Sequence, residues 1–110
     1  MSGMFQYCDL LTTVPLFDTS NVTKISNMLN HCSLLKFIPL FNTNKITNMT
    51  NMLINCINVE SGALALYQQA STQTTPPAWH TATFTNCGSN TQTGAAELAQ
   101  IPSDWGGTGA

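Results

Sequence analysis

The sequence has little charge and no arginine. Only 7% of its 110 residues are charged, against about a quarter in an average soluble domain. The basic residues are three lysines, and the formal net charge is −2. Binding to nucleic acid depends on many Lys and Arg contacts to phosphate, and a membrane-surface patch needs clustered basic residues. We therefore expect neither nucleic acid nor a charged membrane surface as a partner.

Long apolar runs are also missing. No run approaches the ~20 residues of a membrane span, and residues 1–20 do not place a basic stretch before an apolar one, as a secretory signal does. The hydrophobic fraction of 43% is nevertheless too high for a disordered chain. The length suits one modest core. These limits predict a single ordered, soluble domain without membrane insertion.

A repeat of 24 residues organises the first half of the chain. Cys8, Cys32 and Cys56 are spaced by 32 − 8 = 24 and 56 − 32 = 24 residues. Residues 4–27 and 28–51 agree at almost all apolar positions, and a third copy begins in register and departs at Gly62. A more distant fourth copy keeps the spacing of an aromatic residue and a cysteine at positions 84 and 87.

A repeat of this length lies in the range of leucine-rich repeats, whose coils stack to share one core. We predict an α/β solenoid of leucine-rich-repeat-like coils with short parallel strands, over residues 1–61. Residues 62–110 form a divergent last coil and a C-terminal cap with short helices at 63–70 and 95–100. Turns are expected at 18–21 and 42–44, where side chains can bond their own backbone. The residues expected to point inward from the strands are Leu10, Val14, Leu16, Leu34, Ile38 and Leu40.

The cap has its own expected features. Ser61 is the predicted N-cap of the first helix, and Pro76 and Pro77 prevent its continuation. The second helix is expected to follow Thr93 and Gly94 and to end before Pro102. Its predicted apolar face consists of Ala95, Leu98 and Ala99. The bulky residues suited to closing the end of the core are Trp79, Phe84 and Trp105.

The repeated motifs resemble a known family. The pattern M-F-x-x-C-x-x-L, followed by F-D-T-S-N-V-T within residues 4–23, is similar to the BspA-like surface-protein subgroup of leucine-rich repeats. The resemblance covers residues 2–58, although the second copy has Asn42 for Asp18 and Lys45 for Asn21. The C-terminal end resembles that of members encoded by gut bacteria and their phages. The resemblance implies a surface adhesin or binding module without enzymatic activity, in a cell-surface or virion setting.

Catalytic, metal and cofactor sites are not indicated. The four cysteines fit a reduced, buried ladder better than disulfides, because side chains stacked in parallel disfavour the S–S dihedral angle. The histidines and cysteines show no spacing typical of zinc ligands. His31 and His80 form no triad with the five acidic residues, and there is no glycine-rich phosphate loop. Asp18 is interpreted as a turn former, and we expect no enzyme, metal or cofactor.

Two functions therefore stay open. The first is an extracellular or virion-surface module that recognises a cell-surface protein or glycan. The second is a structural phage virion subunit, in a tail tip, fibre or decoration, that assembles through an uncapped N-terminal coil. In that case residues 4–17 contact preceding repeats or another subunit. For the first function, the predicted binding residues are those that differ between the copies: Gln6, Asp9, Thr12, Asn30, Ser33 and Lys36.

Overall fold

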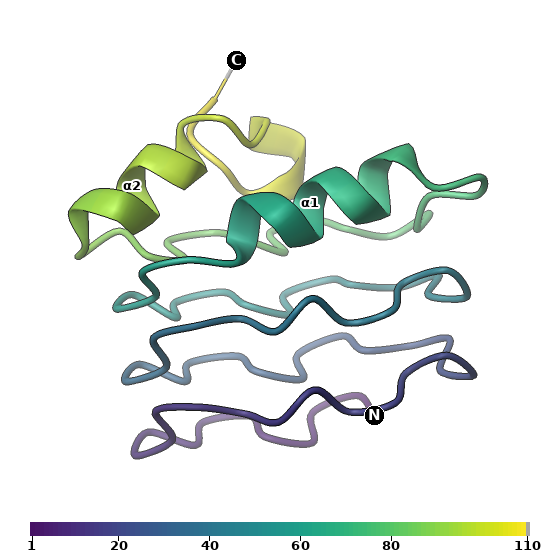
Figure 1. Cartoon of the computed structure of the whole chain (residues 1–110), viewed down its shortest axis with the longest axis horizontal. Helices are drawn as coiled ribbons and strands as arrows, with labels where there is room; N and C mark the ends of the chain where they lie inside the picture. The colour runs from purple at the N-terminus through teal and green to yellow at the C-terminus, as the bar shows by residue number, and fades with distance from the viewer. Residues whose placement is uncertain (110) are drawn as a thin grey trace.

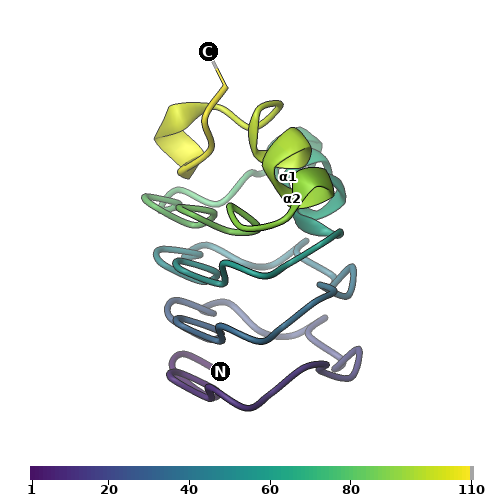
Figure 2. The ribbon, with the colours of Figure 1, turned by 90° about the vertical axis from the view of Figure 1, so that its left-hand side faces the viewer.

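The computed structural model describes residues 1–109 as a stack of irregular coils covered at one end by helices (Figure 1). The helices are α1 (Ala63–Thr72), α2 (Gln92–Leu98) and the short 3-10 helix η1 (Ser103–Trp105). Seen from the side, each coil lies flat on the next, and α1 and α2 lie toward one side of the stack (Figure 2). The molecule measures 31 × 31 × 18 Å.

Each coil has two long sides. The front segments, residues 9–17 and 33–41, run on the side of α1, and the back segments, residues 2–7, 26–31, 50–55 and 81–86, run on the opposite side (Figure 1). Helix α1 follows where a third front segment would continue, because Ser61 pairs with Phe37 in a parallel bridge and α1 begins two residues later.

The predicted α/β solenoid with short parallel strands is wrong. Residues 1–109 contain no strand and no sheet, and the coils share only isolated parallel bridges, such as Lys24 with Asn48 and Asn48 with Trp79. A strand turns alternate side chains to opposite faces. The front segments instead turn every third side chain to the core. These inward residues are Leu11, Val14, Phe17, Leu35, Ile38 and Phe41.

Tight turns explain this three-residue period. The backbone N–H of Phe17 donates to the carbonyl of Pro15 at 3.0 Å, and Phe41 donates to Pro39 at 2.9 Å. Each bond closes a three-residue turn around the intervening leucine. Leu16 therefore points outward, although a strand would have turned it to the same side as Val14. The other leucines predicted to point inward, at positions 10, 34 and 40, are exposed as well.

The back segments are chains of four-residue turns. In the second coil, the backbone N–H of Met28 donates to Ile25, that of Asn30 to Asn27, and that of Cys32 to Leu29. Two positions in each coil have positive φ, which asparagine and glycine tolerate best. The first position is occupied by Gly3, Asn27, Asn51 and Ala82, and the second by Tyr7, His31, Asn55 and Asn86. The last coil is seven residues longer, since 82 − 51 = 31, and the extra length accommodates α1.

Hydrogen bonds between coils keep the repeat in register. Along the back, N–H groups donate to the coil that follows: Phe5 to Met28 and Leu29 to Met52, both at 2.9 Å. Along the front, both directions occur, since the N–H of Lys36 donates to Thr12 of the preceding coil and the N–H of Ile38 donates to Ser61 of the following one, both at 3.1 Å.

The cysteines form the predicted buried ladder and are free. The Cys56 thiol donates to the Leu29 carbonyl at 2.9 Å, and the Cys32 thiol donates to Phe5 at 3.2 Å. Burial raises the pKa of Cys56 to about 12 and that of Cys32 to about 11. Burial also raises the pKa of Cys87 well above its ordinary value, whereas Cys8 is only partly buried. The ladder thus consists of neutral thiols that act as small apolar groups.

Both predicted helices exist with shifted ends. Helix α1 begins at Ala63, but its N-cap is Gly62 with φ 108°, not Ser61. Glycine is needed there because a Cβ would press on the Ile38 backbone. Helix α2 begins three residues before the predicted start, because the Thr91 side chain caps it by accepting from the N–H of Gly94.

The closing residues differ in part from those predicted. Phe84 and Trp105 are buried at the covered end of the stack, as predicted. Trp79 is 61% exposed and does not close the core. On α2, only Leu98 of the predicted apolar face is buried, while Ala95 and Ala99 are exposed.

Candidate binding surface

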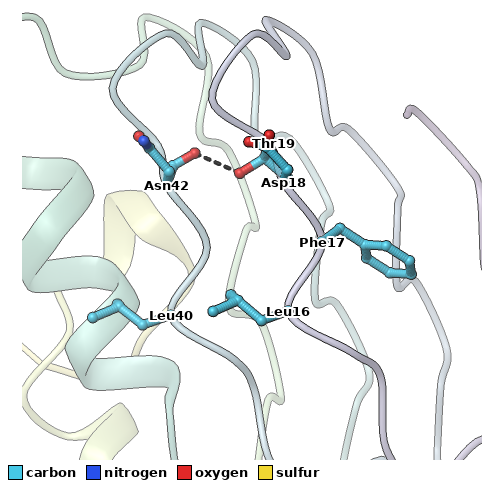
Figure 3. A pocket seen from close by; sticks show the side chains of 6 residues that line it. All are labelled: Leu16, Phe17, Asp18, Thr19, Leu40 and Asn42. Atoms are coloured by element: carbon cyan, nitrogen blue, oxygen red, sulfur yellow. Dashed lines mark hydrogen bonds between the residues drawn. The ribbon is translucent and has the colours of Figure 1, made fainter.

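Large apolar side chains are exposed together on the front segments. We define the leucine face as these five residues, each between 41% and 86% exposed: Leu10, Leu16, Leu34, Phe37 and Leu40. The 24-residue repeat aligns Leu10 with Leu34 and Leu16 with Leu40. Figure 3 shows Leu16 and Leu40 pointing to the same side, while Phe17 points the other way. Large apolar side chains that are exposed in a group are typical of interaction sites.

A hollow of about 270 Å³ opens beside this face. Leu16 and Leu40 form its apolar wall, and the turns that follow the front segments form its polar wall (Figure 3). The Thr19 hydroxyl donates to the Asn42 carbonyl at 2.7 Å and so ties the two turns together. The hollow is therefore preformed. Its lining residues are Leu16, Phe17, Asp18, Thr19, Leu40 and Asn42.

Asp18 places a carboxylate at this hollow. One carboxylate oxygen accepts from the backbone N–H of Ser20 at 3.0 Å and from the Ser20 hydroxyl at 2.6 Å. These hydrogen bonds lower the pKa of Asp18. Asn42 accepts from the N–H of Asn44 in the same way, which confirms Asp18 as a turn former. The hollow thus combines an apolar wall with one negative charge.

The predicted binding residues differ in their exposure to solvent. Gln6, Asp9, Thr12 and Lys36 are exposed, and Ser33 is intermediate. Asn30 is the exception: it was expected at the surface and is only 7% exposed.

The environment of Asn30 explains its burial. Its side-chain amide donates to the Asn27 side chain at 2.9 Å, and its side-chain oxygen lies 2.6 Å from Nδ1 of His31. These contacts stabilise the turn of the back segment. Folding therefore explains why the second copy has Asn30 where the first copy has Gln6.

Thr12 and Lys36 are brought together with the leucine face. Both lie on front segments, and the Lys36 backbone N–H bonds the Thr12 carbonyl. Gln6 lies on the back segment of the first coil, away from them. The sequence does not predict the leucine face, because its four leucines are expected to point into the core. The three-residue spacing of Leu11, Val14 and Phe17 was the signal that could have revealed it.

The histidines take part in stacking contacts. His31 packs on Tyr7 with ring centroids 5.0 Å apart. His80 stacks on Trp105 at 4.0 Å with an interplanar angle of 6°, and its Nδ1 lies 3.1 Å from the Asp104 carbonyl oxygen. Within residues 1–109, no three His, Cys, Asp or Glu side chains gather as they would around a metal ion.

No helix in the described part of the chain has the length and apolar character needed to cross a membrane. The features above define a protein of stacked 24-residue coils with an exposed apolar side. The chain belongs to the family described as Mycoplasma protein of unknown function, DUF285, which it matches over residues 1–105. Comparison with curated proteins found no match. Comparison with solved structures found none either.

Proposed function

We propose that this protein is a non-catalytic binding module whose leucine face recognises a protein on a cell surface. The observation that carries the proposal is the exposure of five large apolar side chains on two successive front segments, four of which are leucines in register. The core does not require them, because Val14, Ile38 and their neighbours already fill it. Folding gives no reason for leucine at these exposed positions, whereas binding does.

The chemistry of the face favours a protein partner over a glycan. Burying one leucine against a partner contributes about 1.5–3 kcal/mol, and the face offers four leucines but one aromatic ring, that of Phe37. The charged groups near it are Asp9, Asp18 and Lys36, so polar recognition is sparse. A partner with complementary apolar side chains and a hydrogen-bond donor near Asp18 fits this surface.

The proposed setting is the cell surface or a virion surface. It is supported by the resemblance of residues 4–23 to surface-protein repeats. It is also supported by the polar groups of the turns, which are mostly uncharged Thr, Ser and Asn.

Binding to intact cells tests the proposal. The labelled chain is added to human epithelial cells and to bacterial cells, before and after protease treatment of the cells. We expect saturable binding that protease treatment removes. The double variant Leu16→Asp/Leu40→Asp should bind at least about 100-fold more weakly, because two buried leucines contribute about 3 kcal/mol.

A matched control distinguishes binding through the leucine face from nonspecific hydrophobic binding. Trp79→Asp also removes one exposed apolar side chain, but Trp79 lies beyond α1 and outside the front segments. This variant should bind like the parent chain, and thermal unfolding should show that all variants fold. Unchanged binding of the double variant would contradict the proposal, and binding that survives protease but not glycosidase would assign the face to a glycan.

A second candidate function is a structural subunit, as in a phage virion, that assembles through its first coil. The specific observation in its favour is the exposure of Met4 and Tyr7. Met28, at the position in the second coil equivalent to Met4, is completely buried in the stack.

A further inference from the structure

The hollow beside the leucine face is small and preformed. Its volume of about 270 Å³ lies below the ~300–1,000 Å³ that is typical of sites for small molecules and cofactors. Its size therefore suits a single side chain of a partner protein. Thr19 is only 1% exposed and bonds the Asn42 carbonyl, so the two turns are fixed relative to each other before a side chain enters.

The hollow has one charged group, the Asp18 carboxylate. Within residues 1–109, hydrogen bonds to this carboxylate come from Ser20 alone, and both reach the same oxygen, Oδ1. They fix the carboxylate in place and lower the pKa of Asp18, so the group is ionised at neutral pH. Lys45 does not neutralise it, because the Lys45 Nζ donates to the Asn21 side chain at 3.2 Å.

A partner that buries the leucine face also covers Asp18, which follows Leu16 by two residues and lines the same hollow. Removing an ionised carboxylate from water is unfavourable unless a cation and hydrogen-bond donors compensate for the lost solvation. The equivalent residue of the second coil is Asn42, which has no charge. The need for a cation therefore arises on one coil only, and it fixes the direction in which the partner lies across the face.

We propose that the hollow binds a lysine side chain of the partner protein, with its methylene groups on Leu16 and Leu40 and its ammonium group at Asp18. This inference rests on the proposed function, binding through the leucine face. Long basic side chains commonly bury their apolar stem and keep the charged end at a polar group.

The free oxygen of Asp18 favours lysine over arginine. A carboxylate oxygen has two lone pairs, and the two donors of Ser20 occupy both of those on Oδ1. Oδ2 alone therefore remains for a partner. An ammonium group pairs with one oxygen, whereas the two-point pairing of arginine requires both.

Three blocked tripeptides test the proposal directly. Each has leucine at both ends, and the middle residue is lysine, norleucine or arginine. Norleucine keeps the apolar stem and lacks the charge. Dissociation constants are measured by ¹H–¹⁵N NMR titration of the full chain. We expect the lysine peptide to bind about 5-fold more tightly than the norleucine peptide, with shifts at Thr19 and Asn42, and at least as tightly as the arginine peptide.

Asp18→Asn should remove the preference for lysine and leave the affinity for the norleucine peptide unchanged. The variant should fold, because Asn42 accepts from the N–H of Asn44 in the equivalent turn, and thermal unfolding checks this. Asp104→Asn removes the same charge from an exposed residue of η1 and should retain the preference. A preference that survives Asp18→Asn, no preference in the parent chain, or tighter binding of the arginine peptide would overturn the proposal.

Cell binding distinguishes this inference from the proposed function. Acetylation of lysines on the cell surface should weaken binding of the parent chain at least about 10-fold, and so should Asp18→Asn. Binding that is lost in Leu16→Asp/Leu40→Asp but unaffected by either treatment would refute the lysine and leave the proposed function standing. Lysine-dependent peptide binding without any cell binding would refute the proposed function instead.

Discussion

Asn51 offers a direct test of the turns that build the coils. Its φ is 57°, and its backbone bonds Thr81 and Ile54. The φ angle is therefore the main property that a substitution at Asn51 changes. We compare Asn51→Gly, Asn51→Ala and Asn51→Val.

The expected order follows from the backbone conformation. A left-handed conformation costs an ordinary L-residue about 1–2 kcal/mol, and this cost is smaller for asparagine than for alanine. We expect Asn51→Ala to lower the free energy of unfolding by about 1 kcal/mol, which shifts the Tm of a domain of this size by about 5 °C. Asn51→Gly should stay within about 0.5 kcal/mol of the parent. Asn51→Val should be the least stable, because a β-branched residue tolerates positive φ worst.

Thermal and urea unfolding measure these differences, and Thr23 is the matched control. Thr23 is exposed and its φ is not positive, so Thr23→Gly should be less stable than Thr23→Ala by about 0.5–1 kcal/mol. The preference for glycine over alanine thus reverses between the two sites. If valine stabilised position 51 and glycine destabilised it, the residue would be extended and the turn-based account would be refuted.

Three further predictions concern the core and the helices. Gly62→Ala should cost at least about 1–3 kcal/mol in urea unfolding, because φ is 108° and a Cβ meets the Ile38 backbone; an unchanged midpoint contradicts this. Phe41→Ala should cost about 3–5 kcal/mol, since this buried ring stacks on Phe17 at 6.4 Å, and a loss below about 1 kcal/mol would place the ring outside the core. The Tm should fall as pH rises from 9 toward 12, because unfolded thiols ionise near pH 9.0 while the folded state holds the pKa of Cys32 near 11 and that of Cys56 near 12. Cys56→Ala should make this fall shallower, and a Tm independent of pH in this window would contradict the thiol assignment.

The repeat register could be predicted from the sequence, because identical residues recur at a constant spacing. Cys8, Cys32 and Cys56 do occupy equivalent positions in successive coils. The longer last coil also leaves Cys87 in the same ladder, as the distant fourth copy indicated. Such features depend on spacing alone, which the sequence shows directly.

The direction of individual side chains could not be predicted in the same way. Assigning Leu16 to the core assumed the two-residue alternation of a strand, and the turn from Pro15 to Phe17 replaces it with a three-residue period. The burial of Asn30 depends on side-chain contacts with Asn27 and His31. The exposure of Trp79 depends on where the chain runs after α1. The candidate surface therefore emerged only from the three-dimensional arrangement.

Cysteine accessibility tests the outward direction of the leucine face most directly. In a Cys8→Ser background, Leu16→Cys and Val14→Cys are each reacted with a thiol reagent under native conditions. We predict that the Leu16→Cys thiol reacts like a free thiol, whereas the Val14→Cys thiol reacts only when the protein opens. Equal protection of both positions, as a strand would give, would contradict the account.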